Sequence, residues 1–263
     1  MAQLFDMQLR SLRRDRAARL GPELFLHERA FDDCVHRIAV VNRRFERALL
    51  IGCPDAGWPT RLGAVAGLVE VADPGPLFAQ ASGGQCVQED QAEWPEAAFD
   101  LCVAVGTLDS VNDLPAALRL IRTAMRPDSL LLGAVAGGDS LRQLRTAIHA
   151  ADQLTGGSSP HVHPRIEPAS LAPLLSACGF VMPVVDVDRV EASYPSLSRL
   201  VGDLRRMGST NLLNARSRTP LTRLGYAAAA AAFGGGDGTR TLERFDILHF
   251  AAWSPPAVTN NRD

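Results

Sequence analysis

Short apolar runs that stop at glycine, proline or aspartate occur throughout the chain. Runs of this kind are typical of buried strands, because turn-forming residues end each strand where it leaves the core. The pattern predicts strands at 48–51, 67–72, 85–88, 99–105, 130–135, 180–187 and 244–253.

Segments with apolar residues at helical spacing separate these strands. They predict helices at 24–43, 114–126, 139–154, 168–177 and 194–233. Aspartate stands just before two of them, at Asp113 and Asp139, where its side chain can cap the first turn. Leu9, Leu12 and Leu20 also fit an amphipathic helix, so we expect a docked N-terminal helix rather than the alternative, an arginine-rich transit peptide.

Strands that alternate with helices predict a mainly parallel, doubly wound α/β sheet. Ligands of such sheets bind outside the carboxyl ends of the strands. The strand ends in this chain are at Gly52, Asp73, Asp90 and Gly106. We therefore expect the functional site among these four residues.

Two of the strand ends carry acids that suit a nucleoside. One carboxylate can accept from both ribose hydroxyls and the other from an adenine amino group. Asp73 follows Gly52 by 21 residues, which matches the usual spacing of a ribose-binding acid. The alternative is that Asp73 and Asp90 only stabilise turns, since acids are common at strand ends.

Composition narrows the possible chemistry. All 27 basic residues are arginine, which excludes Schiff-base lysine catalysis and the lysine-dependent phosphate loops. With 29 acidic residues the net charge is -2, which argues against a dedicated nucleic-acid binder. No apolar stretch is long enough to predict a membrane span. Five scattered cysteines favour free thiols in a reducing compartment, so we expect a cytoplasmic protein.

Several short motifs are distributed along the chain, most of them in its second half. They are Phe99-Asp100-Leu101, Val111-Asn112-Asp113-Leu114-Pro115, Met125-Arg126-Pro127-Asp128, Gly137-Gly138-Asp139-Ser140-Leu141, Ser159-Pro160-His161, Tyr194-Pro195, Asp203-Leu204, Met207-Gly208, Asn211 and Leu4-Phe5-Asp6. The first three of these motifs resemble the type-11 group of class I S-adenosylmethionine (SAM)-dependent methyltransferases. The others, including the N-terminal Leu4-Phe5-Asp6, resemble that group's mitochondrial complex I assembly factors, also described as arginine hydroxylases. Methyltransferases that act on a malonyl carrier protein are a more distant resemblance.

The resemblance implies a Rossmann-like fold with a seven-stranded, mostly parallel sheet whose last strand is antiparallel. It implies N-terminal helices at 1–45, a core at 46–190, a helical cap at 191–235 and a last strand with a C-terminal tail at 236–263. It also implies SAM as the cofactor. The residues expected to bind it are Gly52, Asp55, Asp73, Asp90 and Gly106.

The glycine loop departs from the family pattern. Leu50 stands where an acid is expected, and Pro54 and Ala56 stand at the second and third glycines. Proline lacks an N–H, and side chains at glycine positions obstruct a close approach of ligand to backbone. Asp55 is our candidate to replace the missing carboxylate. After the fourth strand, Leu108-Asp109-Ser110 replaces the aromatic pair that is usual in the family.

Three residues are candidates for the chemistry itself. His161 lies in the family-like triplet, Tyr194 opens the predicted cap, and Asp139 follows two glycines at a strand end. Packing or helix capping is the alternative for each. No metal site is expected, although His161 and His163 with Glu167 form a less favoured two-histidine alternative.

The resemblance implies a methyltransferase-like protein that acts on, or assembles, a subunit of respiratory complex I. A protein substrate or partner follows from this, with membrane association only through that partner. One alternative is a non-catalytic assembly chaperone that retains the fold with a degenerate cofactor loop. A second alternative is a methyltransferase of small molecules or of a carrier protein.

Overall fold

Seven strands pair into one mixed sheet in the order β3-β2-β1-β4-β5-β7-β6. The computed structural model describes residues 3–155, 159–235 and 238–257; the ends of the predicted 1–45 and 236–263 segments therefore lie outside the described residues. The strands are β1 (Phe45–Ile51), β2 (Ala66–Asp73), β3 (Gln85–Cys86), β4 (Phe99–Val105), β5 (Met125–Gly137), β6 (Val181–Tyr194) and β7 (Thr241–Trp253). β7 is antiparallel to both β5 and β6, and the other pairs are parallel. The expected seven-stranded sheet is confirmed.

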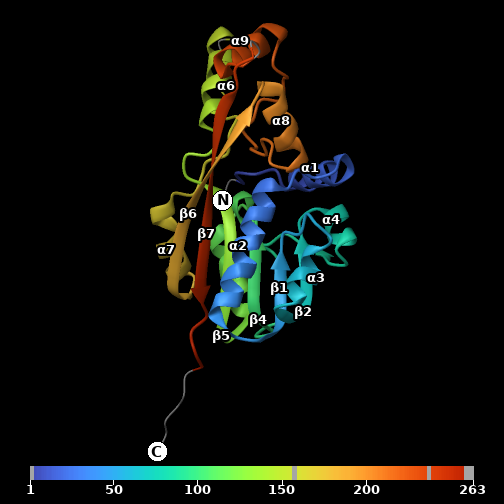
Figure 1. The fold of residues 1–263 in the computed structure, drawn as a ribbon, viewed down its shortest axis with the longest axis vertical. Helices are drawn as coiled ribbons and strands as arrows, with labels where there is room; N and C mark the ends of the chain where they lie inside the picture. Colours follow the sequence, from blue (N-terminus) through green and yellow to red (C-terminus); the bar gives the residue numbers. More distant parts are fainter. Residues whose placement is uncertain (1–2, 156–158, 236–237, 258–263) are drawn as a thin grey trace, which may run out of the picture.

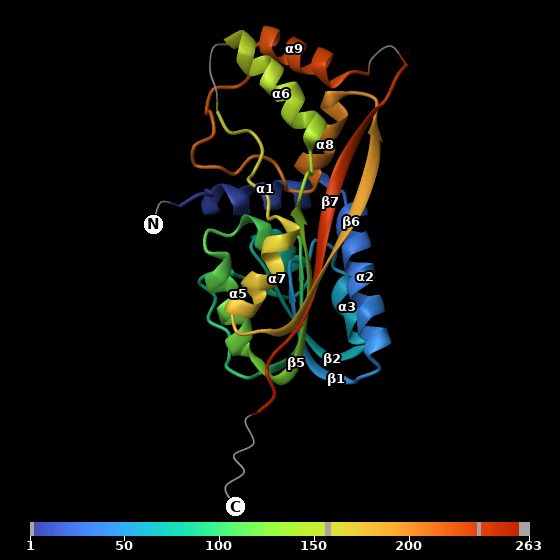
Figure 2. The same ribbon diagram turned by 90° about the vertical axis from the view of Figure 1, so that its left-hand side faces the viewer.

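Helices cover both faces of the sheet, as Figure 2 shows. α2 (Phe25–Val41) and α3 (Trp58–Gly63) lie on one face, and α5 (Leu114–Ala124) and α7 (Pro168–Ala177) on the other. Every residue of β4 is buried, because this central strand contributes side chains to both layers. This explains why its sequence is apolar on both faces rather than alternating, and its one charged residue, Asp100, is buried where it accepts from the N–H groups of Glu46 and Arg47.

A cap of three helices stands at one end of the sheet (Figure 1). It consists of α6 (Arg142–Thr155), α8 (Leu197–Arg206) and α9 (Arg223–Phe233). β6 and β7 run on beyond the other strands to reach it, and its own apolar cluster includes Tyr194, Leu200 and Phe245. α6 lies outside the predicted cap segment 191–235, but it packs against α9.

The continuous helix predicted at 194–233 is wrong. β6 continues to Tyr194, α8 ends at Arg206, and an irregular segment precedes α9. Gly208 adopts φ +73°, a left-handed conformation that ends a helix, and Pro220 restricts the backbone further. The run of six alanines at 227–232, which lies inside the predicted helix, belongs to α9 alone.

The prediction that the side chain of Asp139 caps the N-terminus of a helix is also wrong. α6 begins only at Arg142, and the carboxylate of Asp139 pairs with Arg145 on the next turn. The side chain that caps α6 is Glu243 of β7, which accepts from the N–H groups of Gln143 and Leu144. Sequence periodicity cannot identify such a cap, because Glu243 lies about a hundred residues away.

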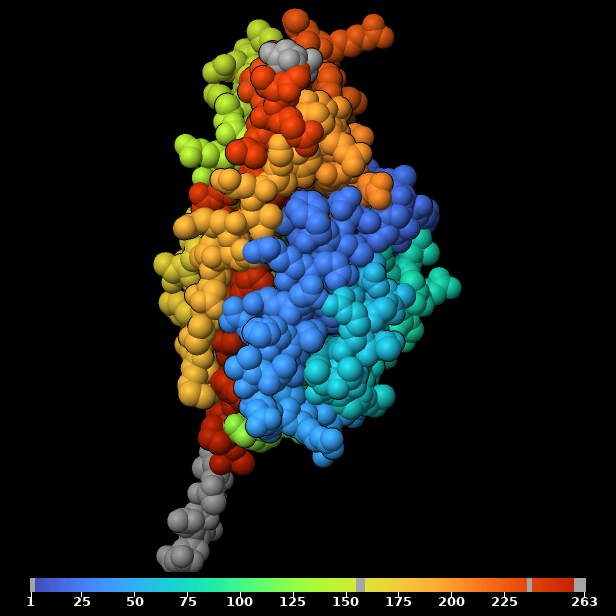
Figure 3. Space-filling model, viewed as in Figure 1, coloured from blue at the N-terminus to red at the C-terminus, as the bar shows by residue number. Residues whose placement is uncertain are grey.

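α1 (Met7–Leu20) docks on the molecule mainly through buried arginines, and of its three leucines only Leu9 packs inward. Leu12 and Leu20 are each 55% exposed, whereas Arg10 and Arg14 are 2% and 6% exposed. The helix lies between the cap and α4 (Pro76–Ala81), and in Figure 3 it fills the space between the orange and cyan segments. The N-terminal helix is thus docked as expected, but it is held largely through a charged face, and Leu9 alone of the three leucines contributes.

None of the helices in the described part of the chain is both long enough and apolar enough to cross a membrane.

Candidate functional site

The turn after β1 brings the backbone close to the neighbouring strand. Gly52 has φ +80°, and a Cβ at this position would lie 2.2 Å from the carbonyl oxygen of Val105. Only glycine satisfies both constraints. The next N–H, that of Cys53, donates to Oδ2 of Asp73 at 2.8 Å. Gly52 therefore sets the spacing between the ends of β1, β2 and β4.

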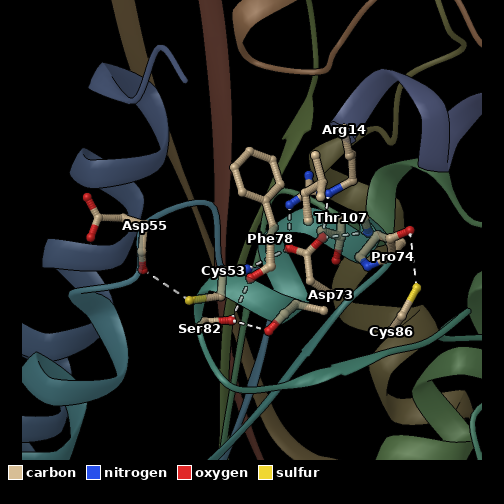
Figure 4. Close-up of polar contacts among 12 residues, drawn as sticks. Arg14, Cys53, Asp55, Asp73, Pro74, Phe78, Ser82, Cys86 and Thr107 are labelled. Carbon is tan, nitrogen blue, oxygen red and sulfur yellow. Dashed lines mark hydrogen bonds and ion pairs between the residues drawn. The ribbon is translucent and has the colours of Figure 1, made fainter. Parts of the chain in front are cut away.

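Asp73 ends β2 as a completely buried carboxylate. It accepts from four donors: the backbone N–H groups of Cys53 and Gly75, and both Nε and Nη2 of Arg14. The contacts to Arg14 are 2.8 and 2.5 Å long. Figure 4 shows this guanidinium facing the carboxylate. Two carboxylate oxygens accept about four hydrogen bonds, so Asp73 is saturated.

A second ion pair lies beside the first. Arg10 forms a bidentate pair with Glu89, at 2.6 and 2.8 Å, and also donates to the carbonyl oxygen of Thr107. Glu89 is completely buried. The expected residue at this strand end was its neighbour Asp90, which instead accepts from the N–H of Asp113 through Oδ2.

Among the polar atoms near these strand ends that are buried without a hydrogen-bond partner in the described part of the chain are Oδ1 of Asp90 and Oγ1 of Thr107. Buried polar atoms normally have a partner, and an orphan atom indicates a ligand or a water molecule. The Asp90 oxygen is an acceptor, as an adenine amino group requires.

The rest of the glycine loop does not compensate for its departures. Asp55 accepts from the N–H of Gly57, and in Figure 4 its carboxylate points away from Asp73. Leu50 is fully buried in the apolar cluster beneath α2 and α3. Asp55 and Asp73 are therefore not brought together in this structure.

A cavity lies on the other side of the strand ends, above β4 and β5. It is bounded by α1, by the start of α2, by β7 and by the segment after α8. Gly106 lines it, whereas Gly52, Asp55, Asp73 and Asp90 do not. Its wall is mainly apolar, with Leu204 and Phe245 among the side chains. Mainly apolar cavities with a few polar groups are typical small-molecule sites.

Two neutral histidines line this cavity. Burial and the nearby Arg14 lower the pKa of His27 to about 4. Burial, followed by the charges of Arg165 and Arg13, lowers the pKa of His163 to about 3. Nε2 of His163 accepts from the N–H of Leu212, so this histidine holds the segment after α8.

Arg165 and Asp109 form a third buried ion pair at the cavity, 3.2 Å apart. Burial raises the pKa of Asp109 and lowers that of Arg165, because each charge is taken out of water. Nε of Arg165 has no partner in any described residue.

Sequence reasoning did not single out Arg10, Arg14, His27, Glu89 or Arg165. The spacing of Arg10 and Arg14, one helical turn apart, was the only available signal.

The three candidates for chemistry lie apart from one another. Nε2 of His161 is 3.1 Å from Asp152, and the ring lines a smaller hollow beside the cavity. Tyr194 is 3% exposed inside the cap, where burial raises the pKa of its hydroxyl. Asp139 pairs with arginines of α6 at the surface. Across the described ranges, no three histidine, cysteine or carboxylate side chains are grouped to hold a metal ion.

The strand order and the site together define a class of protein. A parallel sheet whose seventh strand inserts antiparallel beside the fifth, with a glycine turn after β1 and an acid after β2, is the arrangement of class I SAM-dependent methyltransferases.

Comparison with known proteins agrees with this class. Residues 24–187 match the methyltransferase domain family, and the chain belongs to it. A crystal structure of the N-methyltransferase NodS from Bradyrhizobium japonicum WM9, in complex with S-adenosyl-L-homocysteine, covers 95% of this chain and 100% of its own. The TM-score is 0.50 at 16% identity, which shows the shared fold.

Two curated relatives are similar in sequence. The mitochondrial arginine-hydroxylase NDUFAF5 of Danio rerio is 36% identical over 179 residues, which are 65% of this chain and 55% of the relative. The malonyl-[acyl-carrier protein] O-methyltransferase of Xylella fastidiosa (strain M23) is 33% identical over 177 residues, which are 64% of this chain and 56% of the relative. The matched region therefore spans little more than half of either relative.

The residues at the strand ends are of the type that would bind the family's cofactor. However, the acceptor atoms of Asp73 are already used by other donors. Asp73 is the acceptor that the sequence predicted for ribose hydroxyls, and Oδ1 of Asp90, which has no described partner, could accept from an amino group. The donors that a ribose would supply are already provided by Arg14. At the methionine end, the backbone carries Pro54 and Ala56 in place of glycines.

Proposed function

We propose that this chain is a SAM-binding methyltransferase-family protein that acts on, or assembles, a subunit of respiratory complex I. The observation that carries the proposal is the strand-end site, where Asp73 and the unpartnered oxygen of Asp90 suit a nucleoside, next to the cavity beside Gly106. The similarity to the NDUFAF5 protein supports the complex I partner.

In this proposal the strand ends of β1, β2 and β3 bind the nucleoside, with Gly52, Asp55, Asp73, Asp90 and Gly106 around it. The cavity above β4 and β5 holds the acceptor, and the cap segment 191–235 excludes water from it. SAM supplies an activated methyl group when bound. His27 lines this cavity, and burial lowers its pKa to about 4, so the ring is neutral at pH 7 and only a weak base towards a bound substrate. His161, Tyr194 and Asp139 remain candidates for substrate contacts.

Calorimetric titration with SAM and with S-adenosylhomocysteine tests the cofactor. We expect saturable heat with both ligands and loss of it in Asp73→Ala. An Asp128→Ala variant is the control, since Asp128 lies at the opposite end of the sheet and is 66% exposed. Absence of heat at millimolar ligand from the folded protein would contradict the proposal.

Mass spectrometry of complex I subunits tests the substrate. A strain that lacks this chain should lose one modification or accumulate unassembled subunits, and re-expression should restore the wild-type pattern. Unchanged modification together with unchanged assembly would argue against a complex I role. We place the protein in the cytoplasm, in contact with the membrane only through this partner.

A non-catalytic assembly chaperone is the second candidate, and specific observations favour it. Leu50, Pro54 and Ala56 replace the residues that hold the cofactor's methionine end, and Arg14 occupies Asp73. In this case Asp73→Ala leaves complex I assembly unimpaired in a protein that remains folded.

A carrier-protein methyltransferase is a third candidate, supported by the Xylella relative. Methyl transfer from radiolabelled SAM to a malonyl carrier protein would support it.

A further inference from the structure

The arginines of α1 take the place that a nucleoside needs. Asp73 has four donors: two are the backbone N–H groups of Cys53 and Gly75, and the other two belong to the side chain of Arg14. Because a carboxylate accepts about four hydrogen bonds, ribose hydroxyls can reach Asp73 only if Arg14 leaves. The carboxylate of Asp73 is therefore saturated without a ligand.

Contacts with Gly75 and Phe78 hold the side chain of Arg14 close to Asp73. A Cβ on Gly75 would lie 2.7 Å from Cβ of Arg14, and its guanidinium lies 5.1 Å from the ring centre of Phe78. The absence of a side chain at Gly75 lets α1 approach the end of β2. A buried bidentate pair of this kind is costly to break, because each lone charge would remain out of water.

The cavity above β4 and β5 offers space for the guanidinium of Arg14 once it leaves Asp73. The side chain of Arg14 lines this cavity, next to His27 and Gly208. Rotation about its side-chain bonds would move the guanidinium from Asp73 into this space while α1 stays in place. The ends of α1 favour this over movement of the whole helix, since Phe5 is 3% exposed against Leu212 and Leu213.

We propose that Arg14 is a built-in occupant of the nucleoside site, and that cofactor binding is an exchange in which ribose hydroxyls replace its guanidinium on Asp73. The neighbouring pair of Arg10 and Glu89 remains intact and holds α1 in place during the exchange. The inference rests on the proposed function, and it adds that Arg14 sets the affinity of the site.

Calorimetric titration of Arg14→Gln with S-adenosylhomocysteine tests the exchange. A ligand that must first displace an occupant binds with an affinity reduced by the fraction of open sites. We expect Arg14→Gln to bind about tenfold more tightly than wild type. Arg19→Gln is the matched control on the same helix, because Arg19 is 65% exposed, and its affinity should equal that of wild type.

Arg14→Lys is a second variant that tests the exchange even if Arg14→Gln does not fold. Lysine retains the charge beside Asp73 but cannot form the bidentate pair, so its affinity should lie between those of wild type and Arg14→Gln. Hydrogen exchange gives a readout that does not depend on activity. The N–H groups of Cys53 and Gly75 should exchange faster in Arg14→Gln without ligand and return to slow exchange with it.

Two outcomes would overturn the exchange, and they differ in what they say of the proposed function. If wild type binds and Arg14→Gln binds equally or more weakly, Arg14 is not an occupant, or it contacts the ligand directly; the proposed cofactor site then stands and the exchange fails. If no folded variant binds at millimolar ligand, the exchange and the proposed cofactor site both fail.

Discussion

Gly52 illustrates how a single residue controls the spacing of three strands. Its left-handed φ and the 2.2 Å approach to Val105 exclude any side chain. We expect Gly52→Ala to lower the free energy of unfolding by about 3 kcal/mol, from backbone strain together with the steric clash. Urea denaturation measures this change.

Gly83 provides the control for Gly52. It also has a positive φ, of +67°, but a Cβ there would meet no atom within 4 Å. Gly83→Ala should therefore cost only the conformational strain, about 1 kcal/mol. Equal costs for the two variants would show that contact with β4 is not what requires glycine at position 52.

His163 makes the stability of the protein depend on pH. Its pKa is about 3 in the folded chain and about 6.5 in an unfolded one. The unfolded state therefore binds the proton first, and stability is lost as the pH falls from 6.5 towards 3. Between pH 7 and pH 5 we expect wild type to lose about 2 kcal/mol more than His163→Gln.

Glutamine at position 163 can still accept from the N–H of Leu212, so the comparison isolates the titration. Denaturation midpoints at several pH values in this range provide the measurement. His36→Gln is the control, since His36 lies on α2 away from the cavity wall. Parallel pH profiles for wild type and His163→Gln would contradict the assignment.

At the scale of elements, α6 depends on a residue from a distant strand. Glu243 is buried and accepts from the first N–H groups of the helix. Glu243→Ala leaves these donors unsatisfied and should destabilise the protein by about 2 kcal/mol. Glu191→Ala, at an exposed position of the adjacent strand β6, should change the unfolding free energy by less than about 0.5 kcal/mol.

Chemical denaturation followed by circular dichroism measures both variants. Hydrogen exchange should show the loss of protection in the first turn of α6 alone for Glu243→Ala. If the first turn remains protected, another group caps the helix.

Sequence patterns predicted the elements of the core far better than those of the cap. β1, β4 and β5 are buried runs with turn residues at their ends, and these signals are local. In the cap, the prediction of one continuous helix at 194–233 was wrong, because it ran through Gly208 and Pro220. α1 was predicted as a helix, but its buried face was misassigned because buried arginines need partners that local periodicity does not reveal.

At the scale of the whole molecule, the cap and the core share β6 and β7. Both strands enter the cap cluster, and Leu200 of α8 is fully buried there. The three tryptophans, Trp58, Trp94 and Trp253, all belong to the core or pack on it. Tryptophan fluorescence therefore reports unfolding of the core alone.

If cap and core unfold as one unit, Leu200→Ala should lower the midpoint of the fluorescence transition. We expect a loss of about 3 kcal/mol, or about 8 °C in Tm, from the cavity left in the cap. Leu224→Ala is the control in the same cap, since Leu224 is 67% exposed. An unchanged fluorescence midpoint with a separate early transition in circular dichroism would show that the cap unfolds independently.

The sequence by itself determined the class of fold and the edge of the sheet at which we propose that a ligand binds, because strand periodicity and turn residues act over short distances. Only the tertiary structure decided that Glu89 rather than Asp90 pairs at that edge, and that Arg14 saturates Asp73 across 59 positions of the chain. These pairings depend on how α1 crosses the strand ends. A buried carboxylate takes whichever donor the packing brings to it, and no local pattern records that choice.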